Sequence, residues 1–198
     1  MSKVTVELIQ ELREKTGLGI MDCKKALLES EGNIEKAIEL LRKKGSLIAE
    51  KRGANQTSQG IVYSYIHSGS KIGVLLEINC ETDFVANTDV IKTLAHNIAM
   101  HIAAMRPRFI SEIDVDSSIL EKEQEIYIAQ LKNEKKPDNI IKTIVEGKMK
   151  KFYAENCLLY QNFIKNDQTT IDGLIKDTIA KVGENIKINR FTRYEIGA

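Results

Sequence analysis

Apolar residues in the first fifty positions recur at intervals of three and four, which is the spacing of amphipathic helices. The residues that carry this pattern are Val6, Ile9, Leu12, Ala26, Leu27, Ile34, Ile38 and Leu41. Glycines predict where the helices end: Gly17 and Gly19 follow the first, Gly32 follows the second, and Gly45 ends the third. Asn33 is the expected N-cap of the third helix. The pattern predicts a three-helix module over residues 1–52.

A polar segment follows this module and separates it from a β-rich region. Residues 53–60 contain no apolar side chain larger than Ala and no periodicity, which is typical of a linker. After it, residues 61–67 and 71–80 are rich in β-forming residues, and Ser68-Gly69-Ser70 can turn one segment back on the other. We therefore expect a β-hairpin.

The remainder of the chain alternates between helical and extended patterns. Residues 87–105 carry one apolar stripe that includes Met105, and Pro107 ends that helix. Further helices are expected at 118–133, 138–154 and 170–182, covering a face of the sheet, with a final strand near 185–196. The predicted fold is α+β: a three-helix, ubiquitin-associated-like module and a core domain over residues 61–198. That core has a three-stranded antiparallel sheet covered by helices and a helical insertion at about 117–155.

Composition excludes several classes of protein. The chain has 198 residues, and its 29 basic residues nearly balance 28 acidic ones, so no global charge attracts nucleic acid or an anionic membrane. No apolar run approaches the roughly 18 residues that a membrane span needs. The N-terminal residues lack the pattern of a signal peptide, and three widely spaced cysteines argue against a disulfide framework. We expect a cytoplasmic protein.

Signatures of catalysis are largely missing from the sequence. There is no phosphate-binding loop ending in Lys-Ser or Lys-Thr, no dinucleotide fingerprint and no nucleophile elbow. His96 and His101 are five positions apart on one helix, so they point in different directions and make a poor metal pair. We expect no cofactor, no metal, no direct nucleotide binding and no covalent chemistry.

Two stretches invite a functional interpretation, although each also has an ordinary structural one. In residues 16–27 a glycine turn leads Ile20 and Met21 into a helix whose N-terminus carries Asp22, yet such residues often pack inward. In residues 79–85 a predicted strand ends and a helix begins, near Asp83 and Phe84. An Asp there is usually a cap, and a Phe is usually core.

The order of motifs along the chain resembles the elongation factor Ts family. Residues 16–27 (Thr-Gly-Leu-Gly-Ile-Met-Asp-Cys-Lys-Lys-Ala-Leu) and residues 82–85 (Thr-Asp-Phe-Val) are similar to that family's signature segments. The similarity continues through residues 71–75, 96–104, 145–152 and 181–186, and so covers nearly the whole chain.

This resemblance implies a guanine-nucleotide exchange factor that binds elongation factor Tu·GDP and promotes GDP release by disturbing the magnesium and phosphate site. It also implies that Asp83 and Phe84 intrude between helices of the GTPase, with Phe84 as a wedge. The other partner-binding residues that it implies are Thr82, Val85, His67, Val182, Gly183, Met21 and Lys24.

The chain departs from the family pattern in three respects. Ile20 stands where many members have a second Met, and residues 161–163 lack a proline found in many members. The chain has room for only one copy of a core subdomain that is duplicated in longer members, so it resembles the short form. We therefore expect a homodimer, formed through an exposed edge strand near Ile186–Tyr194.

Two rival functions remain open at this level. The three-helix module resembles ubiquitin-associated domains, which would suit a peptide-binding adaptor; a fragment of the first fifty residues would then keep its binding, whereas an exchange factor would lose activity. The basic, aromatic residues 148–153 would suit RNA binding, with a solvated helix face as the alternative.

Overall fold

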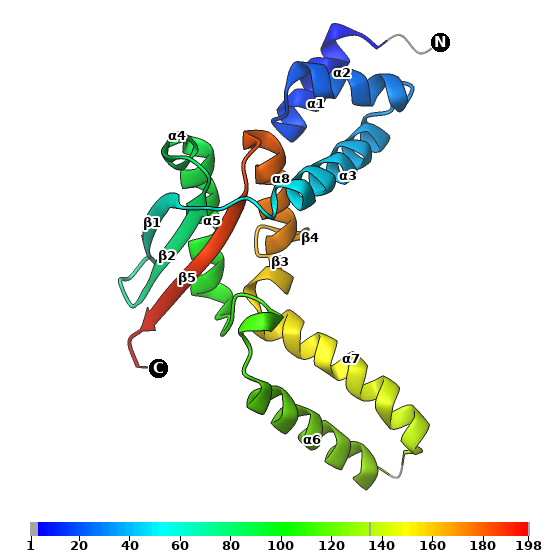
Figure 1. The fold of residues 1–198 in the computed structure, drawn as a ribbon, viewed down its shortest axis with the longest axis vertical. Coiled ribbons are helices and arrows are strands. Elements are labelled where there is room, and N and C mark those ends of the chain that lie inside the picture. The colour runs from blue at the N-terminus through cyan, green and yellow to red at the C-terminus, as the bar shows by residue number, and fades with distance from the viewer. Residues whose placement is uncertain (1–3, 135, 198) are drawn as a thin grey trace. The chain divides into compact units, whose positions relative to one another are not determined.

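The computed structural model describes residues 4–134 and 136–197 and has the predicted α+β architecture (Figure 1). Contacts between Cα atoms divide the chain into two compact units. The first contains the chain up to Tyr63, Leu76–Asn97 and Gly173–Phe191. The second contains Ser64–Leu75, Ile98–Asp172 and the chain from Thr192 on.

The three N-terminal helices are present as predicted. They are α1 (Val6–Thr16), α2 (Ile20–Glu29) and α3 (Ile34–Arg52). The Asn33 side chain accepts a hydrogen bond from the Lys36 backbone N–H at 2.8 Å, which confirms Asn33 as the N-cap of α3. The helices enclose their own core, formed by Leu12, Cys23, Ala26, Leu27, Ala37 and Leu41.

Helix α3 does not end at Gly45, and that prediction was wrong. The helix continues to Arg52, and Gly45 is buried within it. A Cβ at position 45 would lie 3.0 Å from the Cβ of Ala180 on α8 (Ile171–Val182). Glycine therefore stands here because two helices approach closely, not because the helix stops.

The central sheet contains three antiparallel strands in the order β1-β2-β5. They are β1 (Gln59–Ile66), β2 (Ile72–Cys80) and β5 (Ile186–Glu195). The predicted hairpin is confirmed, since His67 N–H donates to the Ile72 carbonyl at 2.9 Å across the turn. The middle strand buries alternate residues on one face: Val74, Leu76, Ile78 and Cys80.

Helix α5 (Asp89–Met105) carries the predicted apolar stripe, in which Ile91, Leu94, Ala95, Ile98 and Ile102 are buried. Met105 was expected to belong to that stripe, but it is exposed at the last turn of the helix. A one-turn helix that was not predicted, α4 (Asp83–Ala86), connects β2 to α5.

The insertion forms a helical hairpin of α6 (Ser117–Asn133) and α7 (Asp138–Asn156) (Figure 1). Its core cluster comprises Val115, Met149, Phe152 and Cys157, with half-buried apolar neighbours from the same region. None of these residues belongs to the three-stranded sheet. These two helices therefore pack on each other and do not cover the sheet as expected, because their apolar faces satisfy one another.

The segment between α7 and α8 contains short elements that the sequence pattern did not indicate. A 3-10 turn, Leu158–Tyr160, precedes the two-stranded sheet of β3 (Asn162–Phe163) and β4 (Asn166–Thr170). Among the residues that the structure describes, no helix is both long and apolar enough to cross a membrane.

Candidate partner-binding site

Residues Thr82–Val85 lie where β2 turns into α4. Thr82 has extended backbone angles and is the N-cap of α4, and its Oγ1 accepts a hydrogen bond from Val85 N–H at 3.4 Å. Cys80 Sγ contacts the Thr82 carbonyl at 3.1 Å. The structural alternative for Asp83, a role as the helix cap, was wrong, because the hydroxyl one residue earlier takes that role.

Phe84 is not a core residue in this structure. Its side chain is 83% exposed, and Asp83 beside it is exposed as well. Ala86, two residues later, is buried, so the turn is anchored from the side opposite the ring. A large ring held in water forgoes about 1.5–3 kcal/mol of burial free energy. Such a residue on a structured turn is typical of a binding contact.

Glu184 joins this turn to the segment that follows α8. Its carboxylate accepts two hydrogen bonds from Thr82: Oε2 from the backbone N–H at 3.0 Å and Oε1 from the hydroxyl at 2.7 Å. Charge-assisted hydrogen bonds of this kind are among the stronger ones in proteins. The position of the α4 N-cap is therefore set by a residue that is 102 positions away in the chain.

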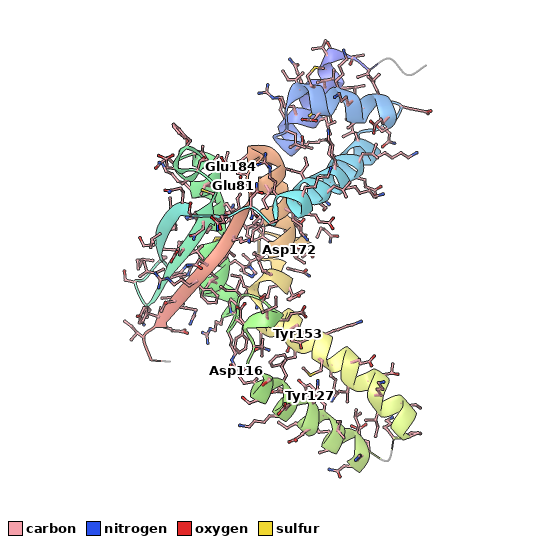
Figure 2. All side chains as sticks on the ribbon, in the orientation of Figure 1. Glu81, Asp116, Tyr127, Tyr153, Asp172 and Glu184 are labelled. Atoms are coloured by element: carbon pink, nitrogen blue, oxygen red, sulfur yellow. The ribbon has the colours of Figure 1, made fainter. Side chains whose placement is uncertain are left out.

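Glu81 makes the reciprocal connection, and Figure 2 shows it close to Glu184. Its Oε1 accepts from the Asn185 backbone N–H at 2.6 Å, and its Oε2 accepts from Asn55 Nδ2 at 3.0 Å and from Arg52 at 3.2 Å. The Asn185 N–H has the largest effect and lowers the pKa of Glu81; burial opposes it, and the Asn55 amide and the Arg52 charge lower the pKa further. The carboxylate is thus held in its charged form.

Val182 and Gly183 form the end of α8, immediately before Glu184. Gly183 has a φ of 76°, in the left-handed region, and its N–H donates to the Ile179 carbonyl at 2.8 Å. Glycine is the usual residue for that helix ending. Residues 182–183 therefore lie directly before Glu184, which is hydrogen-bonded to Thr82. Two connected turns, at residues 82–85 and 182–185, thus contain six of the nine predicted site residues: Thr82, Asp83, Phe84, Val85, Val182 and Gly183.

Met21 and Lys24 lie on the outward side of α2, away from the module core. Met21 is 63% exposed, Ile20 and Leu28 are exposed too, and Lys24 is exposed one turn after Met21. The alternative that Ile20 and Met21 pack inward was wrong. Asp22 lies in the first turn of α2, and its carboxylate pairs with Lys44 of α3 at 2.6 Å.

His67 belongs to the second compact unit and follows the last residue of β1. It is exposed, and its Nδ1 lies 3.0 Å from the hydroxyl of Tyr65. His67 and the two connected turns therefore belong to different compact units.

The other residues considered from sequence have structural roles. His101 is fully buried and hydrogen-bonded to Gln161 at 3.0 Å. In the cluster 148–153, Met149 and Phe152 are buried, so these side chains are not available for stacking on bases. No group of three or more His, Cys, Asp and Glu able to hold a metal ion occurs among the described residues.

Comparison with known sequences gives the two turns a family context. A sequence model of the family described as "Elongation factor TS" matches residues 3–198 of this chain. The chain belongs to the elongation factor Ts family. The assignment confirms the resemblance drawn from residues 16–27 and 82–85.

Individual relatives agree with this assignment. The elongation factor Ts of Thermotoga neapolitana is 54% identical over 195 residues, covering 98% of each chain. That of Thermotoga maritima is 53% identical, covering 98% of this chain and 97% of the relative. That of Thermoanaerobacter sp. strain X514 is also 53% identical, covering 98% and 95%. These relatives therefore have nearly the same length as this chain, in agreement with the short form of the family.

Sequence reasoning missed the residues that connect the two turns. Glu81 directly precedes Thr82 within a stretch that was singled out, and Glu184 and Asn185 lie in the segment 181–186 that carries the resemblance. Both segments were therefore visible as motifs. Nothing in their spacing showed that residues 81–82 and 184–185 exchange hydrogen bonds.

Proposed function

We propose that this protein is a guanine-nucleotide exchange factor that binds elongation factor Tu·GDP and promotes GDP release. Phe84 acts as a wedge, and Asp83 lies beside it as a charged group near the magnesium and phosphate site of the GTPase. The protein binds no nucleotide itself, forms no covalent bond with its partner and works in the cytoplasm during translation elongation. GTP can then enter the emptied site.

The observation that carries this proposal is the exposure of Phe84 on a turn that is fixed at its N-cap. A rigid ring can displace a partner's side chains, because the ring itself loses little conformational freedom on binding. The adjacent carboxylate of Asp83 disfavours GDP phosphates by like-charge repulsion if it approaches their site. Family membership supports the choice of elongation factor Tu as the partner.

Exchange by this route follows from differential affinity. The factor must bind the nucleotide-free GTPase more tightly than the GDP form, since a ligand shifts an equilibrium only by its difference in affinity for the two states. Linkage requires that GDP weakens the grip of the factor by the same amount. Exchange is therefore reversible, and an excess of GTP drives it forward.

The N-terminal module supplies docking in this proposal. Met21 offers an adaptable apolar contact, and Lys24, one turn later on the same side of α2, adds a charge that steers association. His67, Val182 and Gly183 make further contacts with the GTPase. Docking and wedging then depend on different elements of the fold.

The proposal is tested by the release of fluorescent GDP from purified elongation factor Tu, with and without this protein. Addition of the protein is expected to raise the release rate by orders of magnitude. Phe84→Ala and Asp83→Ala are expected to lower that rate, whereas Ile113→Ala, which truncates another exposed apolar side chain, leaves it unchanged. An unchanged rate with a cognate partner would overturn the proposal.

We further propose that the protein is a homodimer, so that a second protomer supplies the half that a single-copy chain lacks. β5 is an edge strand of the sheet. In the second unit, Ile66, Leu75, Tyr194 and Ile196 are exposed. A Cβ added at Gly73 would lie 3.1 Å from Ile66 Cδ1, on the face of β2 that Leu75 shares. An apolar sheet face beside a free edge suits a two-fold contact.

Sedimentation equilibrium at micromolar concentration tests this assembly. A mass of two chains is expected, and Leu75→Lys is expected to shift it toward one chain by placing a charge on the apolar face. A monomer at every concentration would remove the dimer and leave the exchange proposal standing.

A further inference from the structure

We propose that Glu184 and Glu81 are positioning residues for exchange, which hold the wedge turn, defined as residues 82–86, in the geometry that acts on the GTPase. This inference rests on the proposed exchange function. It concerns two carboxylates that do not carry the wedge themselves.

The wedge turn cannot maintain its shape alone. Helix α4 has four residues, and a single helical turn is unstable in water because nucleation costs more than one turn of hydrogen bonds returns. The exposed ring of Phe84 contributes no buried contact that would fix it. The turn must therefore be held at its ends, by Ala86 in the core and by Thr82 at the N-cap.

Glu184 is the group that holds the N-cap end. Its two oxygens bind the backbone N–H and the hydroxyl of Thr82, so both the position and the rotamer of the capping residue are set. Because the Thr82 hydroxyl donates its hydrogen bond to Glu184, the lone pairs of its oxygen remain available to accept from Val85 N–H. The carboxylate thus orients the cap that starts the helix carrying Phe84.

Glu81 closes the connection from the other direction. It accepts from the backbone N–H of Asn185, the residue after Glu184, and it also binds Asn55 and Arg52. Residue 184 therefore holds residue 82 while residue 81 holds residue 185. Two acceptors that act in opposite directions prevent one turn from sliding past the other.

A held wedge affects the rate of exchange more than the affinity of docking. A loose turn must lose its conformational freedom each time it enters the partner, and this cost falls on the step in which Phe84 inserts. Docking through α2 precedes that step and uses other residues. Loss of the hydrogen bonds that Glu184 and Glu81 accept should therefore lower the rate at saturation and leave the half-saturating concentration nearly unchanged.

The experiment measures GDP release from elongation factor Tu as a function of factor concentration for the full-length protein. Glu184→Ala and Glu81→Ala are expected to lower the saturating rate about tenfold or more, as the loss of charged hydrogen bonds predicts. Glu77→Ala is the matched control. Glu77 also joins β2 to β5, through Asn189 at 2.8 Å and Arg190 at 2.7 Å, but lies away from the wedge turn. Its saturating rate should equal that of the wild type.

Coupling to Phe84 provides the decisive readout. If Glu184 acts through the wedge, Glu184→Ala should have little further effect in a Phe84→Ala background, because both changes remove the same step. Equal losses in both backgrounds would overturn the inference, as would equal losses in Glu77→Ala and Glu184→Ala.

Thermal unfolding of each variant shows whether it remains folded. If Glu184→Ala does not fold, Thr82→Val removes the hydroxyl donor with nearly the same side-chain shape, and it should show the same selective loss of saturating rate. A wild-type protein without any exchange activity would overturn the proposed function itself. An active wild type with an unaffected Glu184→Ala or Thr82→Val variant would overturn only the positioning role.

Discussion

Gly45 of α3 faces Ala180 of α8 so closely that a Cβ at position 45 would lie 3.0 Å from the Cβ of Ala180. Gly45→Ala would force the two helices apart or crowd them, and overpacking of this kind typically costs about 1–3 kcal/mol. We expect a lower free energy of unfolding, measured by urea denaturation.

Gly147 provides the matched control for that change. It is exposed within α7, and nothing lies within 4 Å of the Cβ that an alanine would add. Gly147→Ala should therefore stabilise the protein by about 0.5–1 kcal/mol through helix propensity alone. A stabilising effect at both positions would contradict the close approach of α3 and α8.

Docking through α2 is tested by Met21→Ala. Its side chain is exposed and contributes little to the module core, so folding should be unaffected. The half-saturating concentration for GDP release should rise about fivefold, which corresponds to about 1 kcal/mol of contact energy, with an unchanged saturating rate. Val6→Ala, an equally exposed position on α1, should alter neither quantity. A lower saturating rate for Met21→Ala would instead assign Met21 to the wedging step.

The lowered pKa of Glu81 predicts an acid dependence of stability. The backbone N–H of Asn185 is the largest cause of this shift. In the folded protein Glu81 therefore keeps its charge at pH values below 4.5, its ordinary pKa. The stabilisation is therefore present above pH 4.5 and lost as the pH falls through the folded-state pKa. Glu81→Gln should be less stable than wild type at pH 6, with the difference shrinking below pH 4.5 in urea titrations. A constant difference down to pH 3 would contradict this assignment.

The buried His101 should make stability depend on pH in a second, higher pH range. Burial lowers its pKa, and its hydrogen bond to Gln161 only partly opposes this effect. Ile164 N–H donates to Nδ1 at 3.3 Å, and Gln161 Nε2 donates to the Glu155 carbonyl at 2.7 Å, so Nε2–H is the donor to Gln161 Oε1. Stability should fall as the pH drops below about 6.5, the ordinary value for His. Nitrogen NMR should show the neutral Nε2–H tautomer persisting below that pH; a charged ring at pH 6.5 would contradict it.

All three thiols should be unreactive in the folded protein. Cys23, Cys80 and Cys157 are each 0% exposed, and burial raises the pKa of Cys157 to about 11. A thiol reagent at pH 8 should therefore label the native chain only at the rate of unfolding, and in urea it should label three thiols per chain. Fast labelling of one thiol, or a disulfide-linked dimer on a non-reducing gel, would contradict their burial.

Local patterns in the sequence predicted most of the elements. Helical spacing identified α1 to α3, α5, α6, α7 and α8, and β-forming runs identified β1, β2 and β5, because each of these elements has one buried face. The predictions failed where the local sequence pattern does not indicate the role that a residue has in tertiary packing. Gly45 was predicted to end a helix but instead permits close packing, and the sequence pattern gave no indication of the short strands β3 and β4 over residues 162–170.

The candidate site shows the same division. The motif around residues 82–85 was recognisable in sequence, and the family it indicated is correct. Burial, however, depends on which surfaces meet in three dimensions, so spacing alone left Phe84 and Met21 undecided between core and contact; the structure exposes both. The hydrogen bonds from Thr82 to Glu184 and from Asn185 to Glu81 join residues more than a hundred positions apart, and only the pairing of β2 with β5 brings them within hydrogen-bonding distance. Periodicity reports neighbours within one helix or strand, whereas hydrogen bonds between distant turns exist only once the strands beside them are paired.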